Sequence, residues 1–353
     1  MPEINNFFTA AIAHGGSDIH LLEGQKPKTR SHGHLAELDF PVLTRETMTA
    51  YLSEICPTGD WERYQKNHDL DFAYAMGEAS RFRANYYYHM GGMGAVFRTI
   101  PTKIKTMEDL HLPPVMKKFA LLRSGLVLVT GPTGSGKSTT LAAIIDHLNT
   151  HSARHILTIE EPVEFVHPRK KSILCQREVG RDTRSFADGL RLATRQDCDV
   201  VLVGEMRDLE TIALAMTAAA MGSLVFGTLH TNSASKTIDR IISVFPTAQQ
   251  GQARTMLADS LKGVVSQTLL VNKDGKGRTA AHEILLATTG LAASIREGNL
   301  GNIRNTIMTG QKDGMQLMDD CIDRHLKKGT ISQEEALLKC IDKRRFLSAT
   351  ALA

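Results

Sequence analysis

Paired cysteines, long apolar runs and low-complexity tracts are all absent from this 353-residue sequence, and each absence excludes a class of protein. Its five cysteines are scattered and never form a C-x-x-C pair, which argues against a disulfide framework and a zinc module. No apolar stretch approaches the roughly 20 residues that cross a bilayer, and the first residues lack the pattern of a secretory signal. With 42% apolar residues, the sequence predicts a folded protein that stays in the cytosol.

Charge is unevenly distributed along the chain, whose formal net charge is +4. Residues 1–100 carry 9 basic and 12 acidic side chains, whereas the remainder has a net charge of +7. A basic surplus is compatible with an anionic partner such as nucleic acid, lipid or nucleotide, but solvated basic faces are also common in ordinary enzymes. Charge alone therefore does not decide the function.

The first hundred residues have the pattern of a small α+β domain. Aromatic and β-branched residues recur at period two between glycine-containing turns, which predicts an antiparallel sheet with one or two helices, one of them over Thr44–Ile55. Pro101 and the Pro113–Pro114 pair interrupt this pattern. They predict a linker over residues 101–120 that packs only locally.

Residues 121–353 have the pattern of a parallel α/β domain with a helical C-terminal part. Short runs of mainly apolar residues alternate with helical stretches, which is typical of buried parallel strands. These runs are residues 126–130, 156–160, 200–204 and 224–230. Beyond Pro246 the pattern predicts helices almost throughout, interrupted by a strand within AAHEILL, residues 280–286.

A phosphate-binding loop follows the first of these strands. The segment GPTGSGKST fits G-x-x-x-x-G-K-[ST] between a strand and a helix, and it comprises Gly131, Pro132, Thr133, Gly134, Ser135, Gly136, Lys137, Ser138 and Thr139. Backbone N–H groups of such a loop bind phosphate oxygens beside a helix N-terminus. Lys137 would neutralise the β and γ phosphates of a nucleotide, and Ser138 would coordinate Mg²⁺.

Polar residues at the ends of the other apolar runs are candidates for the remaining chemistry. Glu205 follows VVLVG and could polarise a water molecule, although it could also be a surface glutamate. Glu160 and Glu161, with Glu164 beyond them, could hold the hydration shell of Mg²⁺ or lie in a solvated loop. His230 could sense the γ-phosphate or a neighbouring subunit, but a lone histidine is more often structural.

These four motifs, in this order, resemble those of the ATPases of bacterial type II secretion and type IV pilus systems, and specifically the type IV pilus retraction ATPases of the PilT family. They are the phosphate loop, the acidic box ILTIEEPVEF, VLVGE and the histidine box GTLHT. Further segments along nearly the whole chain look like signatures of the same family: GGSDIHL, RFRANYY, AVFRTIP, LPPVMKK, QREVGRDT, VGEMRDLETI, AAHEILL and GMQLMDD.

The resemblance implies a PAS-like N-terminal domain, residues 1–100, joined to a RecA-like ATPase domain, residues 121–353. It implies a ring-shaped homohexamer that binds ATP and Mg²⁺ between protomers, with Arg83 and Arg98 as arginine fingers from a neighbour. A guanidinium delivered in this way stabilises the transferring phosphoryl group, but both arginines could instead form salt bridges within their own domain. The resemblance further implies an inner-membrane pilus platform protein as partner at the cytoplasmic face, and twitching motility as the output.

The sequence departs from the family pattern at three places. Glu161 stands where the family usually has aspartate, and HMGG follows Tyr88 where a glutamine and an arginine are common. GLAAS stands in place of the motif alanine-isoleucine-arginine-asparagine-leucine, so that Ala292 and Ala293 replace arginine and asparagine. Pilus extension ATPases usually carry a longer N-terminal region and a paired-cysteine module, so the sequence favours retraction over extension.

Three alternatives remain open from the sequence. The first is an accessory retraction paralogue, or a secretion or conjugation ATPase with a similar core. The second is a RecA-like motor stimulated by nucleic acid, although no base-reading module or aromatic stacking platform is recognisable and no nucleic-acid partner is expected. The third is a regulatory ring that binds nucleotide without productive hydrolysis.

Overall fold

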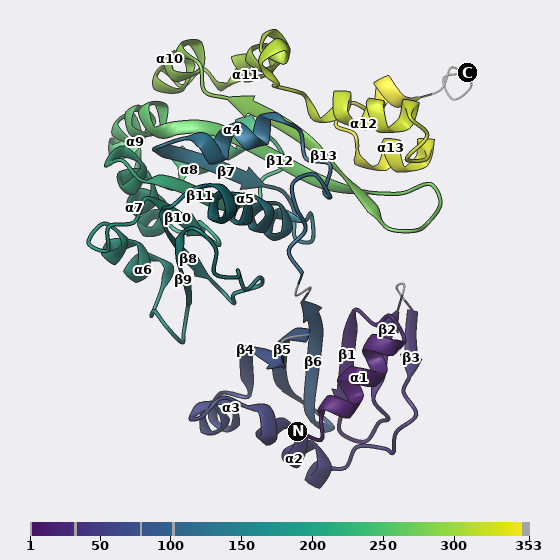
Figure 1. The fold of residues 1–353 in the computed structure, drawn as a ribbon. Helices are drawn as coiled ribbons and strands as arrows, with labels where there is room; N and C mark the ends of the chain where they lie inside the picture. The colour runs from purple at the N-terminus through teal and green to yellow at the C-terminus, as the bar shows by residue number, and fades with distance from the viewer. Residues whose placement is uncertain (1, 32–33, 78–79, 101–102, 348–353) are drawn as a thin grey trace. The chain divides into compact units, whose positions relative to one another are not determined.

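The computed structural model describes residues 2–31, 34–77, 80–100 and 103–347. The chain divides into two units, each with its own sheet (Figure 1). The first unit holds residues 1–103 and the short segment 162–166. The second holds residues 104–161 and 167–353.

The first unit is an antiparallel sheet, as its sequence pattern predicts, and its described residues form three helices where one or two were predicted. The strand order is β3-β2-β1-β6-β5-β4. The strands are β1 (Asp18–Leu22), β2 (Lys28–Ser31), β3 (His34–Glu37), β4 (Asp69–Met76), β5 (Ser80–His89) and β6 (Gly92–Ile100). The helices are α1 (Asn5–Ala13), α2 (Arg45–Ile55) and α3 (Asp60–Asn67).

One face of this sheet is buried because alternate strand residues are apolar. Phe82, Ala84 and Tyr86 of β5 are fully buried and belong to the same core as Phe8 of α1. The Tyr86 hydroxyl donates to the carbonyl oxygen of Leu52 at 3.1 Å, so this buried polar group is satisfied. The helix predicted over Thr44–Ile55 is confirmed as α2, with Thr44 as its N-cap.

The second unit is built on a seven-stranded sheet of order β13-β12-β7-β11-β10-β8-β9. Every neighbouring pair is parallel except β12 and β13. The strands are β7 (Gly125–Thr130), β8 (His155–Glu160), β9 (Ile173–Glu178), β10 (Val200–Val203), β11 (Leu224–Leu229), β12 (Leu261–Val271) and β13 (Arg278–Leu286). The four predicted apolar runs are therefore confirmed as parallel strands.

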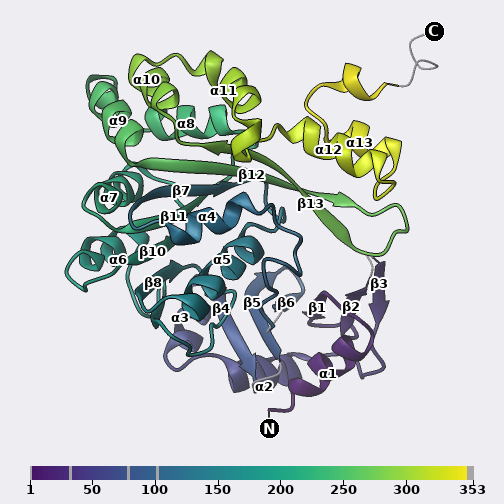
Figure 2. The same cartoon turned by 45° about the horizontal axis from the view of Figure 1, so that its top comes forward.

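Helices cover both faces of this sheet, and its strands are accordingly apolar on both sides (Figure 2). Along β7, Leu126 and Leu128 belong to one core, whereas Val127 and Val129 belong to another with α4 and α5. The helices are α4 (Val115–Leu121), α5 (Lys137–His151), α6 (Phe186–Ala193), α7 (Leu209–Ala220), α8 (Ala234–Ser243), α9 (Thr247–Ser260), α10 (Thr289–Glu297), α11 (Ile303–Thr309), α12 (Met318–Lys327) and α13 (Gln333–Lys339). Short 3₁₀ turns lie at Leu300–Asn302, Gln311–Asp313 and Lys343–Phe346.

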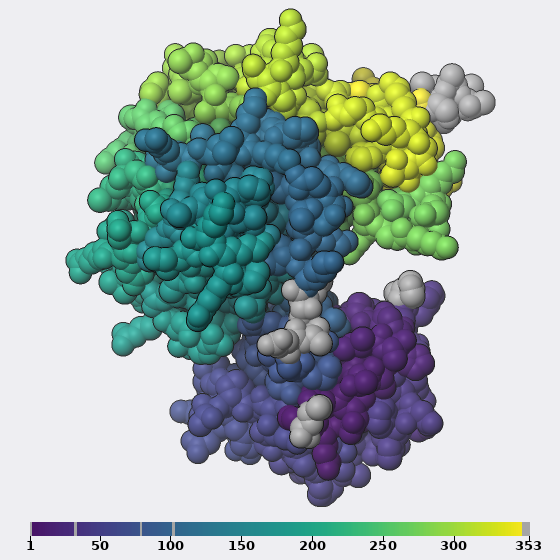
Figure 3. Space-filling view, in the orientation of Figure 1, coloured from purple at the N-terminus to yellow at the C-terminus, as the bar shows by residue number. Residues whose placement is uncertain are grey.

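The C-terminal helices form a separate lobe of the second unit, coloured yellow in Figure 3. Its small core joins residues of α12 and α13 to Leu270 of β12 and Ala281 of β13. This lobe therefore packs on the β12–β13 hairpin rather than on the centre of the sheet. None of the helices in the described part of the chain combines the length and apolar composition of a membrane span.

Two further expectations from the sequence differ from the structure. The long strand β12 lies where helices were predicted beyond Pro246, and it pairs with β13 across the turn that follows Val271. Most of the predicted linker 101–120 belongs to the second unit, where Met107, Met116 and Phe119 are buried against the sheet core. The prediction that this segment packs only locally is wrong, because its apolar residues cover one face of the sheet.

Buried His167 should make the fold sensitive to mild acid. Burial lowers the pKa of His167 from 6.5 to about 4, and its Nδ1 finds no hydrogen-bond partner among the described residues. In the unfolded chain His167 binds a proton below about pH 6.5, whereas in the folded chain it does so only near pH 4. The free energy of unfolding is therefore unaffected by His167 well above pH 6.5 and decreases as the pH falls below it. Between pH 7 and pH 5 this single group should cost about 2 kcal/mol.

The measurement compares urea unfolding of the wild type and of His167→Gln at pH 7 and pH 5. Glutamine does not titrate, so the variant should lose about 2 kcal/mol less than the wild type over this interval. Other buried groups, including His282, are common to both proteins and cancel in the comparison. Equal losses in the two proteins would contradict the prediction.

Candidate active site

Four parallel strands of the second unit end at one edge of the sheet, where their last residues lie side by side. Thr130 of β7 is paired with Leu229 of β11, and Val203 of β10 is flanked by Gly227 of β11 and Ile159 of β8. Glu160 is the last residue of β8, and the segments that follow β7, β10 and β11 carry the phosphate loop, Glu205 and His230. The topology therefore brings together the strand-end residues that the sequence singled out, at the edge where open α/β sheets bind ligands.

The phosphate loop between β7 and α5 has a backbone that requires glycine. Gly131 and Gly136 have φ angles of 148° and 85°. A Cβ on Gly131 would lie 2.2 Å from the carbonyl oxygen of Gln267, so a side chain has no room there. Gly136 is the N-cap of α5, whose first turn contains Lys137, Ser138 and Thr139.

The side chains of this loop fit an anionic ligand. Ser135 is 3% exposed, and its Oγ finds no hydrogen-bond partner among the described residues. Lys137 lies against the loop and donates from Nζ to the carbonyl oxygens of Gly131 at 2.8 Å and Pro132 at 3.1 Å. An ammonium group, a spare hydroxyl and the N-terminus of a 15-residue helix together favour phosphate oxygens.

Glu205 is the central carboxylate at this edge and contacts two basic side chains. Its Oε1 lies 2.5 Å from Nε of Arg207 and 2.9 Å from Nε2 of His230. Burial acts to raise the pKa of Glu205, but the hydrogen bond and charge of Arg207, together with His230, outweigh burial and lower that pKa. Glu205 is therefore held as a carboxylate, the form that a group of general-base type requires.

The acidic box lies at the end of β8. Glu160 is half-buried, and its Oε1 accepts hydrogen bonds from Thr158 Oγ1 at 2.7 Å and from Gln176 Nε2 at 3.4 Å. Glu161 is exposed and contributes to the raised pKa of Arg207, behind the larger effect of Glu205. Glu164 falls in the segment that groups with the first unit. Glu160 ends β8, which pairs with β10, the strand before Glu205. Glu161 acts on Arg207, the partner of Glu205.

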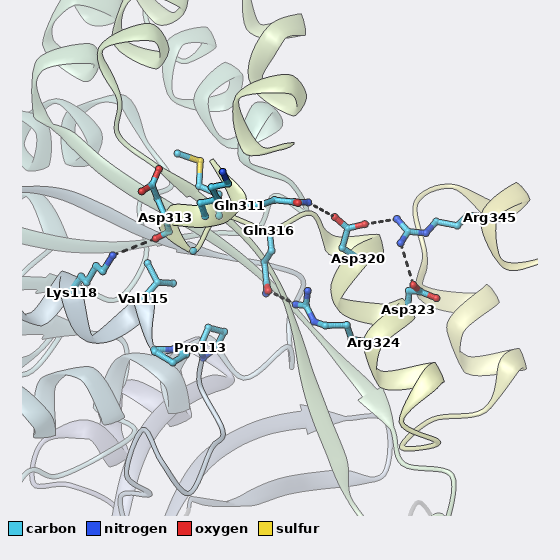
Figure 4. A pocket seen from close by; sticks show the side chains of 14 residues that line it. Pro113, Val115, Lys118, Gln311, Asp313, Gln316, Asp320, Asp323, Arg324 and Arg345 are labelled. Atoms are coloured by element: carbon cyan, nitrogen blue, oxygen red, sulfur yellow. Dashed lines mark hydrogen bonds and ion pairs between the residues drawn. The ribbon is translucent and has the colours of Figure 1, made fainter. Parts of the chain in front are cut away.

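A cavity of about 660 Å³ lies elsewhere in the second unit, between the start of α4 and the C-terminal lobe (Figure 4). Asp320 on its wall is bound by Arg345 and Gln311, and Arg345 also reaches Asp323 at 3.4 Å. Its polar groups are largely engaged with one another. None of the residues predicted for the site lines this cavity, so the strand-end edge remains the candidate active site.

Comparison with known proteins identifies the family of the chain. Residues 1–311 match the sequence model of the family described as "Type II/IV secretion system protein". The type IV pilus retraction ATPase PilT of Pseudomonas aeruginosa is 47% identical over 334 residues, which is 95% of this chain and 97% of that protein. The chain belongs to the PilT family. A twitching motility protein of Neisseria gonorrhoeae is 46% identical over 310 residues, covering 88% of this chain and 83% of that protein.

The fold of this PilT-family chain is also similar to that of a solved structure. The crystal structure of the pilus retraction motor PilT with bound ADP superimposes with a TM-score of 0.90 at 42% identity, and the match covers 98% of each chain. The fold class predicted from the sequence, a small N-terminal domain followed by a RecA-like ATPase domain, is confirmed.

Arg83 and Arg98, which the sequence comparison with the family predicts to be arginine fingers, lie directly opposite each other on β5 and β6. Like charges in such a cross-strand pair repel. Arg98 donates from Nε to Asp18 Oδ1 at 2.8 Å, and Nε of Arg83 lies 3.7 Å from Asp71 Oδ1. Both side chains remain exposed, at 44% for Arg83 and 70% for Arg98. Each arginine thus has a carboxylate in its own unit and is still accessible from solvent.

Some residues of this PilT-family site were not singled out from the sequence. Arg207 was quoted only within the signature VGEMRDLETI, yet it is the strongest partner of Glu205. Gln267 contacts the phosphate loop from β12, a strand that the sequence pattern did not predict. Of the departures from the family pattern, Ala292 packs partly against the core of the second unit and Ala293 is exposed, both on α10.

Proposed function

We propose that this PilT-family ATPase hydrolyses ATP with Mg²⁺ and uses the energy to retract type IV pili. The observation that carries this proposal is the ionised Glu205 at the same sheet edge as the phosphate loop, in a chain 47% identical to a retraction ATPase over 95% of its length. The alternative of a regulatory ring without hydrolysis lacks support from the site, since both a phosphate loop and a candidate base are present.

The chemistry is divided among the residues of the edge. Backbone N–H groups of the loop and Lys137 would hold the phosphates, and Ser138 would contribute its hydroxyl to Mg²⁺. No group of three or more His, Cys, Asp or Glu among the described residues could hold a metal ion by itself. Mg²⁺ would therefore be held chiefly by phosphate oxygens and water, with Glu160 and Glu161 binding that water.

Glu205 orients the attacking water, and His230 responds to hydrolysis through its contact with Glu205. The carboxylate of Glu205 accepts a hydrogen bond from a water placed in line with the γ-phosphate. Nε2 of His230 lies 2.9 Å from Oε1 of Glu205. If hydrolysis changed this contact, the loop between His230 and α8 would move with it. Arg83 and Arg98 of a neighbouring protomer would stabilise the charge of the transferring phosphoryl group.

The assembly that follows from this division of labour is a homohexamer at the cytoplasmic face of the inner membrane. A ring supplies each site with the arginines of its neighbour. Its partner would be an inner-membrane pilus platform protein, through which the ATPase associates with the membrane. ATP binding and hydrolysis would move the two units of each protomer and drive pilus disassembly.

Imaging pili in a strain that lacks this chain tests the proposal. Retraction predicts cells with excess pili that do not twitch, restored by the wild-type gene and not by Glu205→Gln. Cells without pili would indicate an assembly motor, and cells that still retract normally would indicate an accessory role. Stimulation of purified ATPase by DNA, with steep salt dependence, would instead support a nucleic-acid motor.

A further inference from the structure

Gln267 lies on β12 beside the phosphate loop, at the point where pairing between β12 and β7 ends. Ser266 is paired with Thr130, the last residue of β7, so the next residue of β12 faces the start of the loop. The carbonyl oxygen of Gln267 is the atom that leaves no room for a Cβ on Gly131, and its Nε2 would lie 2.9 Å from a Cβ on Gly136. Gln267 therefore touches both ends of the loop.

The side-chain amide of Gln267 bridges the loop and the helix that follows it. Its Nε2 donates to the carbonyl oxygen of Ser135 at 2.7 Å, and its Oε1 accepts from Thr140 Oγ1 at 2.8 Å. A carbonyl oxygen can only accept, which fixes the orientation of the amide. Gln267 and Thr140 are 3% and 2% exposed, so water does not compete for these hydrogen bonds.

His282 of the neighbouring strand β13 holds the amide from the other side. Gln267 and His282 are cross-strand partners, and His282 Nε2 lies 3.2 Å from Gln267 Oε1. Burial lowers the pKa of His282 to about 3, so its imidazole is neutral at physiological pH and can donate from Nε2. The carbonyl oxygen of His282 accepts from Gln316 Nε2 at 2.8 Å, which ties β13 to the segment before α12.

We propose that Gln267, supported by His282, is a positioning residue that keeps the phosphate loop in its nucleotide-binding conformation. Gln267 does not reach the ligand through its own amide, since both ends of that amide bind protein groups. It acts through the backbone at Ser135 and through the first turns of α5. The β12–β13 hairpin is in this way part of the nucleotide site, although it contributes none of the phosphate-binding motif.

A positioning role of this kind has a distinct kinetic consequence. The loop contacts the phosphates in the ground state and in the transition state alike, so loosening it weakens both to the same extent. Such a loss of uniform binding raises KM with little change in kcat. Because His282 is neutral across the working range, the effect should be the same at pH 6.5 and pH 8.

The experiment measures binding of a fluorescent ADP analogue, together with KM and kcat for ATP, in Gln267→Met. The expected result is about tenfold weaker binding and a KM raised by a similar factor, with kcat within about twofold of wild type. Gln316→Met is the matched control. It removes an amide that contacts His282 but not the loop, and it should bind the analogue as the wild type does.

Thr140 provides a second pair of variants in case Gln267→Met folds poorly. Thr140→Val removes the hydroxyl that donates to Gln267 and should weaken binding several-fold, whereas Thr140→Ser keeps the hydroxyl and should restore it. Unchanged binding in Gln267→Met, equal effects of the two Thr140 variants, or a fall in kcat at constant KM would overturn the proposal. It rests on nucleotide binding and not on pilus retraction, so a wild-type chain that binds ADP but retracts no pili leaves it intact.

Discussion

Glu205→Gln is expected to lower ATP turnover by roughly 10²–10⁴-fold while nucleotide binding persists. Glutamine has the same shape but accepts a proton poorly and carries no charge. In the wild type the side chain of Glu205 is held ionised by Arg207 and His230, in a place that is only 18% exposed. The measurement is single-turnover phosphate release beside titration with a fluorescent ADP analogue.

Two comparisons make the Glu205 result specific. Lys137→Ala should weaken nucleotide binding itself, because Lys137 is the residue proposed to neutralise the phosphates, whereas Glu205→Gln should not. Arg207→Gln removes the main group that lowers the pKa of Glu205, so the acid limb of turnover should move to higher pH. Full turnover in Glu205→Gln, or binding lost together with turnover, would contradict the role given to this residue.

The central strands of the second unit could be predicted from the sequence because strands buried on both faces need apolar residues at nearly every position. Residues 126–129 and 200–203 are apolar throughout, and each is covered by helices on both sides. Strand β12 was missed for the opposite reason. It carries Ser266 and Gln267, polar and fully enclosed, because they bind Thr130 and the phosphate loop. A polar residue retained for a site breaks the pattern that would reveal the strand.

The residues of the site also fall into two groups. Some could be found from the local sequence, and others are brought to the site only by the fold. The phosphate loop and Glu205 each follow an apolar strand, so position along the chain was enough to find them. Gln267 reaches Ser135 across 132 residues of sequence, a contact for which no local pattern exists. Sequence order likewise could not show that Arg83 and Arg98 are opposite each other, because strand register is a property of the assembled sheet.

This register leads to a prediction about the two arginines, which we expect to act on the site of a neighbouring protomer. Arg98→Ala and Arg83→Ala should each lower turnover of the assembled ring by roughly 10³-fold, the lower end of the effect of arginine fingers in other phosphoryl-transfer enzymes. Nucleotide binding by the isolated chain should be unchanged, because the phosphate loop belongs to the second unit. Arg63→Ala, which removes an exposed arginine paired with Asp60 at 3.1 Å, is the control and should retain turnover.

Mixing variants distinguishes an arginine from the neighbour from one within the same protomer. A ring assembled from Arg98→Ala and Glu205→Gln protomers contains interfaces where an intact phosphate loop and Glu205 meet an intact Arg98 of the adjacent protomer. Such mixed rings should regain a measurable part of the wild-type turnover, although rings of either variant alone have strongly lowered turnover. If Arg98 acted within its own protomer, every protomer would lack one of the two groups and mixing would restore nothing. Absence of recovery in rings shown to contain both variants would therefore exclude action of Arg98 on the neighbouring site. Wild-type turnover of Arg98→Ala itself would remove Arg98 from the catalytic machinery and leave its pair with Asp18 as its role.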